Sequence, residues 1–462
     1  MLKKLISTNP ARNYEKIDEV EISREEEIIE KVNKAQKAKL GWKEMSLEDR
    51  IPYFEKLMAV YKKRGEEVAE IQTKEVGKVI KESREDVEFD LFGIENNIRI
   101  AREVLKPEIL DESETQKNIL YFEPYGIMVV IVPWNFPSSN FFISCIQPLL
   151  AGNTIVFKHS EECPLTGKIL EEIMEEAGFP EGVFSEVYGD GKVGDMLTNQ
   201  AIDAIHFTGS TKIGRYLYEK AALKFIPATL EMGGSSPGII FKDANLDMAC
   251  KHALAERFLC CGQVCCALKR LIVHESIYSE VIERMKKAVE SMKVGDPMDK
   301  NTDIGPLVTK RQLDLLIEQV EDAKKKGSTV ITGGDVVGDL NGAFYKPTIL
   351  TNLIMDMKVL TEEVFGPVLP ILSFKTEKEA IELANKTIYG LSAFVYGSDF
   401  EQLKRVALKI EAGQISINNT SYFSDNSPFG GYKMSGIGRN SGKMGFYEVT
   451  QKKVVSEPVR KN

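Results

Sequence analysis

IMVVIVPW at 127–134 opens the stretch of sequence that decides the fold, in which short apolar runs alternate with helical patterns. The segments that follow it are TGKILEEIMEEAG (166–178), VFSEVYG (183–189), KVGDMLTNQ (192–200) and AIDAIHFTG (201–209). Strands that are separated by helices pair in parallel, because the helix returns the chain to the end of the sheet where the strand began. The alternation therefore predicts a parallel sheet built from βαβ units.

A second alternation of the same kind begins near Ser236. Before both units, residues 23–105 carry apolar side chains at helical spacing, which predicts several amphipathic helices. Two α/β lobes imply a crevice in which a cofactor and a substrate can meet. The segments of the second alternation are GIIF (238–241), DMACKHALAERF (247–258), KRLIVH (269–274), YSEVIERMKKAVESM (278–292), TVITGG (329–334), PTIL (347–350), LPILSF (369–374) and EKEAIELANKT (377–387).

The composition is that of a globular protein with two or three domains. The chain has 462 residues, of which 43% are hydrophobic and 28% are charged, and its formal net charge is −9. Lys and Arg are not clustered, so we expect no nucleic-acid partner. The most apolar run, 127–133, is too short to span a membrane, and residues 1–10 lack the apolar stretch of a secretory signal. We therefore expect no membrane contact.

Four of the seven cysteines lie in CCGQVCC (260–266), and two interpretations of that segment are open. A structural zinc site favours Cys-x₂-Cys pairs or Cys/His combinations, and the four histidines are scattered, so no metal is expected. Cys265 could instead be a reactive thiol, because small neighbours such as Gly262 and Ala267 leave room for a ligand, although an inert thiol has the same spacing. Adjacent cysteines do not make a disulfide framework, so a reducing, cytoplasmic location is expected.

Two glycine-rich turns could approach a dinucleotide. GDGKVG (189–194), which contains Gly191, has the G-x-G-x-x-G spacing after a predicted strand. The acidic residue expected about 20 positions later is missing, so an ordinary turn remains the alternative. FTGSTKIG (207–214) is a second turn of this kind, in which Ser210 could face a ligand or simply cap a helix.

Two charged pairs lie at the ends of predicted strands. FKHSE (157–161) places Lys158 and Glu161 after a strand, where they could hydrogen-bond ribose hydroxyls or form a solvated loop. Lys269 and Arg270 open KRLIVH and are the cations nearest to Cys265 in sequence, but at a strand start they could simply face solvent.

Seven motifs follow one another along nearly the whole chain: EPYGIMVVIVPWNFP (123–137), LLAGNTIVFKHSE (149–161), HFTGSTKIG (206–214), LEMGGSSP (230–237), GQVC (262–265), EEVFGPV (362–368) and PFGGYKMSGIGR (428–439). In this order they resemble the aldehyde dehydrogenase superfamily. The resemblance implies NAD(P)-dependent, non-acylating oxidation of an aldehyde to a carboxylic acid. The short N-terminus and the pairs at 158–159 and 269–270 are most similar to the short succinate-semialdehyde dehydrogenase branch.

The resemblance also implies a role for each matched residue. Cys265 would be the nucleophile, Glu231 the general base, and Asn135 with the backbone amide of Cys265 the oxyanion hole. The implied cofactor-binding residues are Trp134 and Phe365 along the cleft, Lys158 and Glu161 at the adenosine ribose, Gly191, Gly209 and Ser210 in the glycine-rich turns and at a phosphate, and Glu363 at the nicotinamide ribose.

The implied chemistry agrees with what these residue types do. A thiolate adds to the aldehyde, hydride transfer leaves a thioester, and water activated by a carboxylate hydrolyses it. CoA-acylating relatives lack the base that Glu231 supplies, and a non-catalytic structural member would not need nucleophile and base together. The cofactor is NADP or NAD. Lys158 would attract a 2′-phosphate and Glu161 would repel one, so these two residues leave the choice open. The branch resemblance gives the lean to NADP.

The fold implied by the resemblance has two Rossmann-like, doubly wound lobes and a small β arm for oligomerisation. The strand edges of the arm need partners, which predicts a homodimer or a homotetramer. Departures from the family pattern occur at Ser235, Cys260, His159 and Asn440, and none removes a catalytic group. The implied domains are 1–105 with 125–233 for the cofactor, 234–447 for catalysis, and 106–124 with 448–462 for the arm.

The segments that would line the substrate tunnel offer neutral donors and apolar walls. They are SSNFFISC (138–145), CCGQVCCALKR (260–270) and NNTSYFSDNSP (418–428). This set predicts a small polar aldehyde, and the branch resemblance makes succinate semialdehyde the best single candidate. The donors are Ser138, Ser139, Thr420, Ser421, Tyr422 and Ser424, and the walls are Phe141, Phe142 and Phe423.

Overall fold

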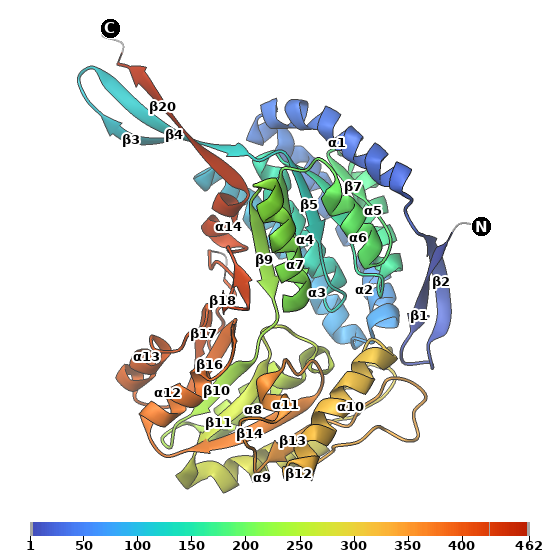
Figure 1. The fold of residues 1–462 in the computed structure, drawn as a ribbon, viewed down its shortest axis with the longest axis vertical. Helices are drawn as coiled ribbons and strands as arrows, with labels where there is room; N and C mark the ends of the chain where they lie inside the picture. The colour runs from blue at the N-terminus through green and yellow to red at the C-terminus, as the bar shows by residue number, and fades with distance from the viewer. Residues whose placement is uncertain (1–2, 425, 460–462) are drawn as a thin grey trace.

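The computed structural model describes residues 3–424 and 426–459. Figure 1 shows two lobes, one built mainly from the N-terminal half of the chain, and a narrow arm that projects away from both. Each lobe has a largely parallel sheet, as the two alternations predicted.

The first lobe is built on a six-stranded sheet with the order β19-β9-β8-β5-β6-β7. All neighbours pair in parallel except β19, which is antiparallel to β9. The chain begins at the central β5, winds outward to β6 and β7, and then crosses back to β8 and β9, so the topological switch point lies between β5 and β8. The strands are β5 (Ile127–Ile131), β6 (Thr154–Lys158), β7 (Phe184–Glu186), β8 (Ala204–Gly209), β9 (Ala228–Met232) and β19 (Gly436–Ile437).

Helices cover both faces of this sheet, which explains why its central strands are apolar throughout. Along β6, Ile155 and Phe157 pack with α2 to α5, whereas Val156 packs with α1, α6 and α7 on the opposite face. The first three helices confirm the amphipathic helices predicted for residues 23–105. The helices are α1 (Glu25–Glu44), α2 (Leu47–Val76), α3 (Ile80–Val104), α4 (Pro137–Ala151), α5 (Pro164–Ala177), α6 (Gly191–Asn199) and α7 (Thr211–Lys224).

A hairpin of β1 (Lys4–Asn9) and β2 (Glu15–Glu21) precedes α1, and the sequence patterns did not predict it. Most of its side chains are polar and at least partly exposed, so it has little hydrophobic periodicity. Ser7 anchors it, because its buried hydroxyl donates a hydrogen bond to the Glu75 carboxylate at 2.6 Å.

The second lobe has a seven-stranded sheet with the order β12-β13-β14-β11-β10-β16-β17, parallel except for the β12–β13 pair. The strands are β10 (Ser236–Ile240), β11 (Leu268–His274), β12 (Thr329–Thr332), β13 (Thr348–Thr351), β14 (Val368–Phe374), β16 (Ser392–Tyr396) and β17 (Gln414–Ile417). The helices are α8 (Leu246–Phe258), the 3₁₀ turns η1 (Leu259–Gly262) and η2 (Glu275–Ile277), α9 (Tyr278–Glu290), α10 (Lys310–Lys325), α11 (Lys358–Thr361), α12 (Glu377–Asn385) and α13 (Phe400–Ala407).

The arm is a three-stranded antiparallel sheet with the order β20-β4-β3 (Figure 1). Its strands are β3 (Glu108–Glu112), β4 (Gln116–Pro124) and β20 (Thr450–Pro458), and α14 (Gly442–Glu448) leads into β20. A small pair, β15 (Tyr389–Gly390) with β18 (Tyr432–Lys433), lies outside these sheets. Residues 460–462 of the predicted arm lie outside the described residues. Within the described ranges, no helix has the length and apolar character needed to cross a bilayer.

Candidate active site

The predicted residues of the first lobe lie at one edge of its sheet. The carboxyl ends of parallel strands meet at the same edge, where open α/β sheets bind their ligands. Lys158 ends β6, Gly209 ends β8, and Asn135 lies in the loop that follows β5. The strand register places Lys158 opposite Ile131, and it pairs Glu231 of β9 with β8.

Cys265 lies in the loop between η1 and β11, and it is the one cysteine of the seven whose side chain is partly exposed. In η1, directly before this loop, two non-glycine residues lie in the left-handed region, Cys260 at φ 50° and Cys261 at φ 56°. Such conformations cost about 1 kcal/mol or more and concentrate at functional sites. Glu82 of α3 stabilises the turn, because its buried carboxylate accepts a hydrogen bond from the Cys260 backbone N–H at 3.1 Å.

The side chain of Asn135 binds this loop. Its Nδ2 donates to the backbone carbonyl of Gln263 at 2.9 Å, and its Oδ1 accepts from Nδ2 of Asn140 at 3.2 Å. The side-chain oxygen of Gln263 accepts the backbone N–H of Val308 at 3.0 Å, which fixes the other side of the loop. An amide nitrogen has two N–H donors, so the second N–H of Asn135 is available to a ligand oxygen.

The groups around the Cys265 thiol act in opposite directions. The hydrogen bond with the Cys266 thiol and burial raise the pKa of Cys265, and the Glu363 carboxylate adds to that shift. The Lys269 ammonium lowers the pKa of Cys265. Lys269 is therefore the group that favours the thiolate, which is the reactive form of a cysteine.

Glu231 is a buried carboxyl group with no hydrogen-bond partner for either oxygen among the described residues. Burial raises the pKa of Glu231 well above its ordinary value, Arg439 opposes the shift, and Glu448 adds to it. A carboxylate whose pKa is raised is a better proton acceptor than an ordinary glutamate once it has ionised. These are the properties of a group that can activate water.

Lys158 is buried rather than solvated, because its side chain is only 4% exposed, whereas the Glu161 side chain is 41% exposed. The Lys158 ammonium donates to the His159 carbonyl at 3.0 Å and lies 3.9 Å from the Glu161 carboxylate. Burial lowers the pKa of Lys158. The lysine therefore has N–H donors to spare beside the sheet edge.

The two glycine-rich turns both lead into helices of the first lobe. Gly191 begins α6 behind the N-cap Asp190, and Ser210 caps α7 by accepting the Ile213 backbone N–H at 3.4 Å. Capping of a helix by Ser210 was the ordinary interpretation of that segment, and it is confirmed. Both helix N-termini present backbone N–H groups that can bind an anion.

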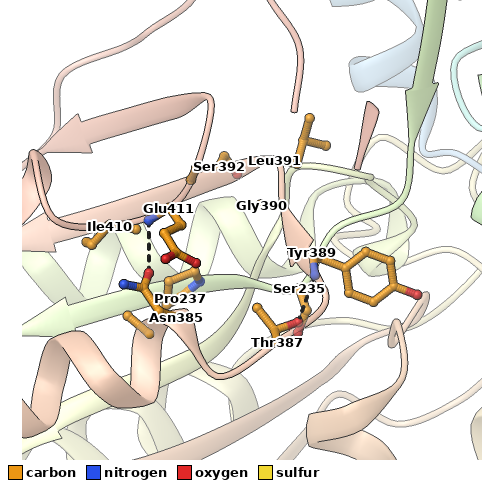
Figure 2. Close-up of a pocket in the computed structure, with 12 residues that line it drawn as sticks. Ser235, Pro237, Asn385, Thr387, Tyr389, Gly390, Leu391, Ser392, Ile410 and Glu411 are labelled. Atoms are coloured by element: carbon orange, nitrogen blue, oxygen red, sulfur yellow. Dashed lines mark hydrogen bonds between the residues drawn. The ribbon is translucent and has the colours of Figure 1, made fainter. Parts of the chain in front are cut away.

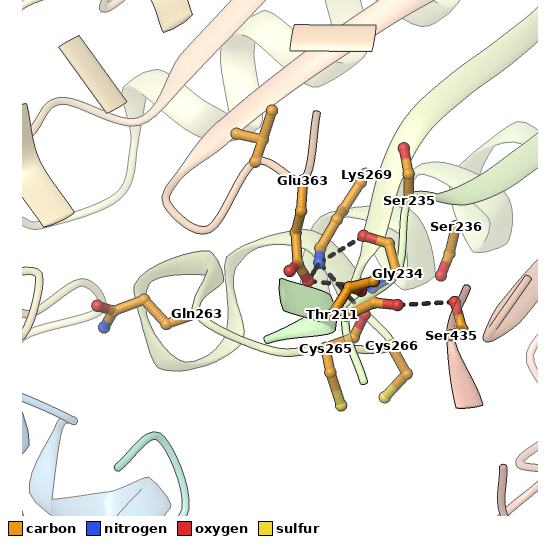
Figure 3. Close-up of polar contacts among 12 residues, drawn as sticks. Thr211, Gly234, Ser235, Ser236, Gln263, Cys265, Cys266, Lys269, Glu363 and Ser435 are labelled. Atoms are coloured by element: carbon orange, nitrogen blue, oxygen red, sulfur yellow. Dashed lines mark hydrogen bonds and ion pairs between the residues drawn. The ribbon is translucent and has the colours of Figure 1, made fainter. Parts of the chain in front are cut away.

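Glu363 of the second lobe lies beside Lys269 and Gly234, close to the loop of Cys265 (Figure 3). Glu363 precedes β14, and its carboxylate accepts the Gly234 backbone N–H at 3.1 Å and forms an ion pair with Lys269 at 2.5 Å. The Phe365 ring meets Trp134 edge-on, with ring centres 5.6 Å apart. Predicted cofactor residues from both lobes are therefore in contact.

Comparison with known proteins matches the model of the "Aldehyde dehydrogenase family" over residues 2–455. The betaine aldehyde dehydrogenase of Bacillus subtilis is 37% identical over 96% of this chain and 92% of its own length. The succinate-semialdehyde dehydrogenase [NADP(+)] GabD of Escherichia coli is 34% identical over 95% of this chain and 91% of its own. This chain belongs to the aldehyde dehydrogenase family. A solved structure, an E. coli NADP-dependent enzyme, superposes with a TM-score of 0.95 at 32% identity, covering 99% of this chain and 95% of that one.

Membership of the family makes this chain an enzyme that oxidises an aldehyde with NAD or NADP. Two contacts in this aldehyde dehydrogenase join predicted site residues across the two lobes: Asn135 contacts the loop of Cys265, and Trp134 contacts Phe365. Among residues 3–424 and 426–459, no group of three or more His, Cys, Asp or Glu side chains is arranged to hold a metal ion.

Lys269 and Arg270 are buried, and the expectation that they could face solvent was wrong. Lys269 is bound by Glu363, and Arg270 donates to the carbonyls of Ser235, Leu383 and Ala384. One sequence signal could have indicated this. In a strand that is buried on both faces, a charged pair has to find partners inside the protein.

Four of the residues expected to line the substrate tunnel lie instead in the core of the first lobe. They are Ser138, Ser139, Phe141 and Phe142, which are at most 5% exposed on the inner face of α4. The half-exposed positions of this segment are Phe136, Asn140 and Ile143, spaced as one helical face. The buried and half-exposed positions alternate with the turn of the helix, because only one face of α4 is turned away from the core.

Figure 2 shows a small cavity that is lined in part by Ser235 and lies between β15 and the end of α12. Its walls include Asn385, whose side-chain oxygen accepts the Glu411 backbone N–H at 2.9 Å. None of the predicted catalytic or cofactor residues lines it. We therefore place the candidate active site at Cys265 rather than in this cavity.

Proposed function

We propose that this aldehyde dehydrogenase converts its substrate to a carboxylic acid through a thioester on Cys265. The observation that carries the proposal is the nucleophile loop, where the partly exposed Cys265 follows Gln263, the residue whose carbonyl is bound by Asn135 at 2.9 Å. A thiol on one loop and an amide donor bound to that loop from the other lobe can act on the two atoms of the same carbonyl group.

The chemistry follows from these residues. The Cys265 thiolate adds to the aldehyde carbon, and the free N–H of Asn135 with the backbone N–H of Cys265 stabilises the oxyanion that forms. Losing one such donor typically costs a factor of about 10²–10³ in rate. A bound nicotinamide would supply the acceptor for the hydride whose loss from the adduct's carbon turns it into a thioester. Water then attacks the thioester carbon, Glu231 takes the proton, and the C–S bond breaks to release the acid and the Cys265 thiol.

The residues present fit a dinucleotide. Lys158 is buried with one carbonyl partner, so about two of its three N–H groups are free for ribose hydroxyls. Gly191 and Ser210 lie at helix N-termini that can face phosphates, and Glu363 would hold the nicotinamide ribose. We propose NADP as the preferred cofactor, a preference supported by relatives whose printed names carry NADP.

A direct test incubates the purified enzyme with an aldehyde and either NAD or NADP, with and without CoA. We expect reduced nicotinamide and the free carboxylic acid in the absence of CoA. Reduced nicotinamide that forms only with CoA, together with an acyl-CoA product, would instead identify a CoA-acylating enzyme. No reduced cofactor with any aldehyde would point to a non-catalytic member of the fold.

We propose a small polar aldehyde as the substrate, with succinate semialdehyde as the first candidate because of the GabD relative. Lys269 and Arg270 are engaged inside the protein, so a substrate carboxylate would be bound by neutral donors such as Thr420 and Ser421. Catalytic efficiency is to be compared for succinate semialdehyde, lactaldehyde, glyceraldehyde, propanal and hexanal. A preference of more than about tenfold for propanal or hexanal would overturn this choice.

We propose a homodimer or homotetramer assembled through the arm. The arm projects from the lobes and exposes apolar side chains, among them Ile109 at 56% and Val454 at 57%, which is typical of a surface that another chain covers. A monomer in light scattering at micromolar concentration would exclude this assembly. All seven cysteines are free, which supports a reducing, cytoplasmic location.

A further inference from the structure

Lys269 is a buried cation that no step of the proposed mechanism uses. It lies near the start of β11, the middle strand of the second sheet, and its side chain is 1% exposed. Taking a charge out of water costs several kcal/mol unless its partners compensate. Leu268 and Leu271 of the same strand are ordinary apolar core residues, so Lys269 and Arg270 are exceptions to the pattern of the strand.

Three acceptors surround the Lys269 ammonium (Figure 3). It donates to the Gly234 carbonyl at 2.8 Å, to the Cys265 carbonyl at 3.2 Å and to the Glu363 carboxylate at 2.5 Å. The ring of Phe365 lies 5.1 Å from the ammonium. Because an ammonium has three N–H donors, its hydrogen-bonding capacity is filled by these contacts.

We propose that Lys269 is a positioning residue that ties the Glu363 carboxylate to the backbone of Cys265 and supplies a buried positive charge that stabilises the Cys265 thiolate. The inference rests on the proposed function, in which Cys265 is the nucleophile and Glu363 binds the cofactor. One side chain would then set both the orientation of a cofactor-binding group and the ionisation of the nucleophile.

Lys269 and Glu363 carry opposite charges, so the direction in which the pKa of Cys265 changes tests the proposal. The ionisable groups that act on Cys265 are Cys266, Lys269 and Glu363, and Lys269 in turn is acted on by Glu363, Arg257 and Cys265. Lys269 favours the thiolate, whereas Glu363 disfavours it. Removing the two charges one at a time should therefore move the pKa of Cys265 in opposite directions, which a purely packing role for Lys269 would not do.

Arg270 offers a matched control on the same strand. It is fully buried, and its three hydrogen bonds at 2.8 to 2.9 Å all go to backbone carbonyls. Successive residues of a strand point to opposite faces, so Arg270 points away from Cys265. Loss of the Arg270 side chain should lower the melting temperature of the enzyme without shifting the pKa of the Cys265 thiol.

The experiment measures the rate at which iodoacetamide alkylates Cys265 as a function of pH, in the enzyme without cofactor, with peptide mapping to identify the modified cysteine. For Lys269→Met we expect the midpoint of the pH profile to rise by about one unit or more, which makes alkylation below the midpoint about tenfold slower. For Glu363→Gln we expect the midpoint to fall. Arg270→Met and the charge-conserving Lys269→Arg should keep it within about half a unit of the wild type.

A second readout is the dissociation constant for NADP, measured by fluorescence titration. Lys269→Met and Glu363→Gln should each weaken binding, and the double variant should lose less than the sum of the two, because the residues act through one ion pair. An unchanged or lowered midpoint in Lys269→Met would overturn the proposal, as would a raised or unchanged midpoint in Glu363→Gln, which decides the matter if Lys269→Met does not fold. Alkylation needs no turnover, so a failure of the proposed aldehyde oxidation would appear in the activity assay and leave this measurement intact.

Discussion

The side-chain amide of Asn135 donates a hydrogen bond to the backbone carbonyl of Gln263 at 2.9 Å, although the two residues are 128 positions apart in the chain. The contact joins the loop after β5 in the first lobe to the loop that carries Cys265 in the second. It places an amide donor next to the predicted nucleophile before any substrate arrives, and such preorganisation is what makes an oxyanion hole effective.

Asn135→Ala should therefore lower kcat by a factor of about 10²–10³ with a smaller effect on KM. The reason is that the amide acts on charge that develops only after the thiolate has added. Asn140→Ala is the control, because it removes the hydrogen bond that orients Asn135 and should cost much less. A loss below about tenfold in Asn135→Ala, measured in steady state, would show that this amide does not bind the oxyanion.

Cys265→Ala should abolish aldehyde oxidation and leave the dissociation constants for NAD and NADP near those of the wild type. Cys265 is the cysteine that solvent reaches, and a methyl group in its place cannot form a thioester. Cys261→Ala, at a buried thiol of the same segment, is the control. Activity that survives in Cys265→Ala but is lost in Cys261→Ala or Cys266→Ala would assign the nucleophile to another cysteine.

Glu231→Gln should slow deacylation more than acylation. Rapid mixing with substrate should then give a burst of reduced cofactor of about one equivalent per active site, followed by a slow steady state. Burial raises the pKa of Glu231, and the ionised form is the base, so wild-type deacylation should slow as the pH falls through that raised pKa. This decrease in the deacylation rate at low pH should be absent from Glu231→Gln. A variant without a burst would show that the hydride step depends on this carboxylate.

Glu161→Gln should move cofactor selectivity towards NADP. The Glu161 carboxylate lies 3.9 Å from the Lys158 ammonium and is partly exposed, so it would repel a 2′-phosphate that the lysine attracts. We expect the NADP/NAD ratio of kcat/KM to rise about tenfold, which corresponds to about 1.4 kcal/mol. Glu162→Gln, one position along and 3.6 Å from Arg311, should leave the ratio unchanged. An unchanged ratio in Glu161→Gln would remove Glu161 from the cofactor site.

Glu82→Gln should make the enzyme's stability less dependent on pH. Burial raises the pKa of Glu82 from 4.5 to about 7, with Lys78 opposing the shift, so the folded state favours the neutral form. The stabilisation is full below about pH 4.5 and is lost as the pH rises through about 7, at most about 3 kcal/mol. The variant keeps an oxygen that can accept from the Cys260 N–H, and its melting temperature should fall less between pH 5 and pH 8. The exposed Glu85→Gln should behave like the wild type, and an equal fall in Glu82→Gln would exclude this titration.

Much of the fold was predictable because the signals are local. The helices of residues 23–105 repeat their apolar side chains every turn, and the strands from β5 onward are short apolar runs separated by helical patterns. The hairpin of β1 and β2 was not predictable in this way. Its strands are mostly polar, and what holds it is a contact of Ser7 with Glu75, far along the chain.

The sequence by itself determined the two α/β lobes, the cysteine in the loop before β11 and the motifs at the strand ends, since alternation and spacing depend only on neighbouring residues. Only the tertiary structure decided which partner each polar group has. Lys269 illustrates the difference, because a lysine at the start of a strand is ordinarily solvated, and here Glu363, 94 positions later, meets it inside the protein. The free energy of a buried charge depends on groups that arrive from other elements, and no local pattern encodes their approach.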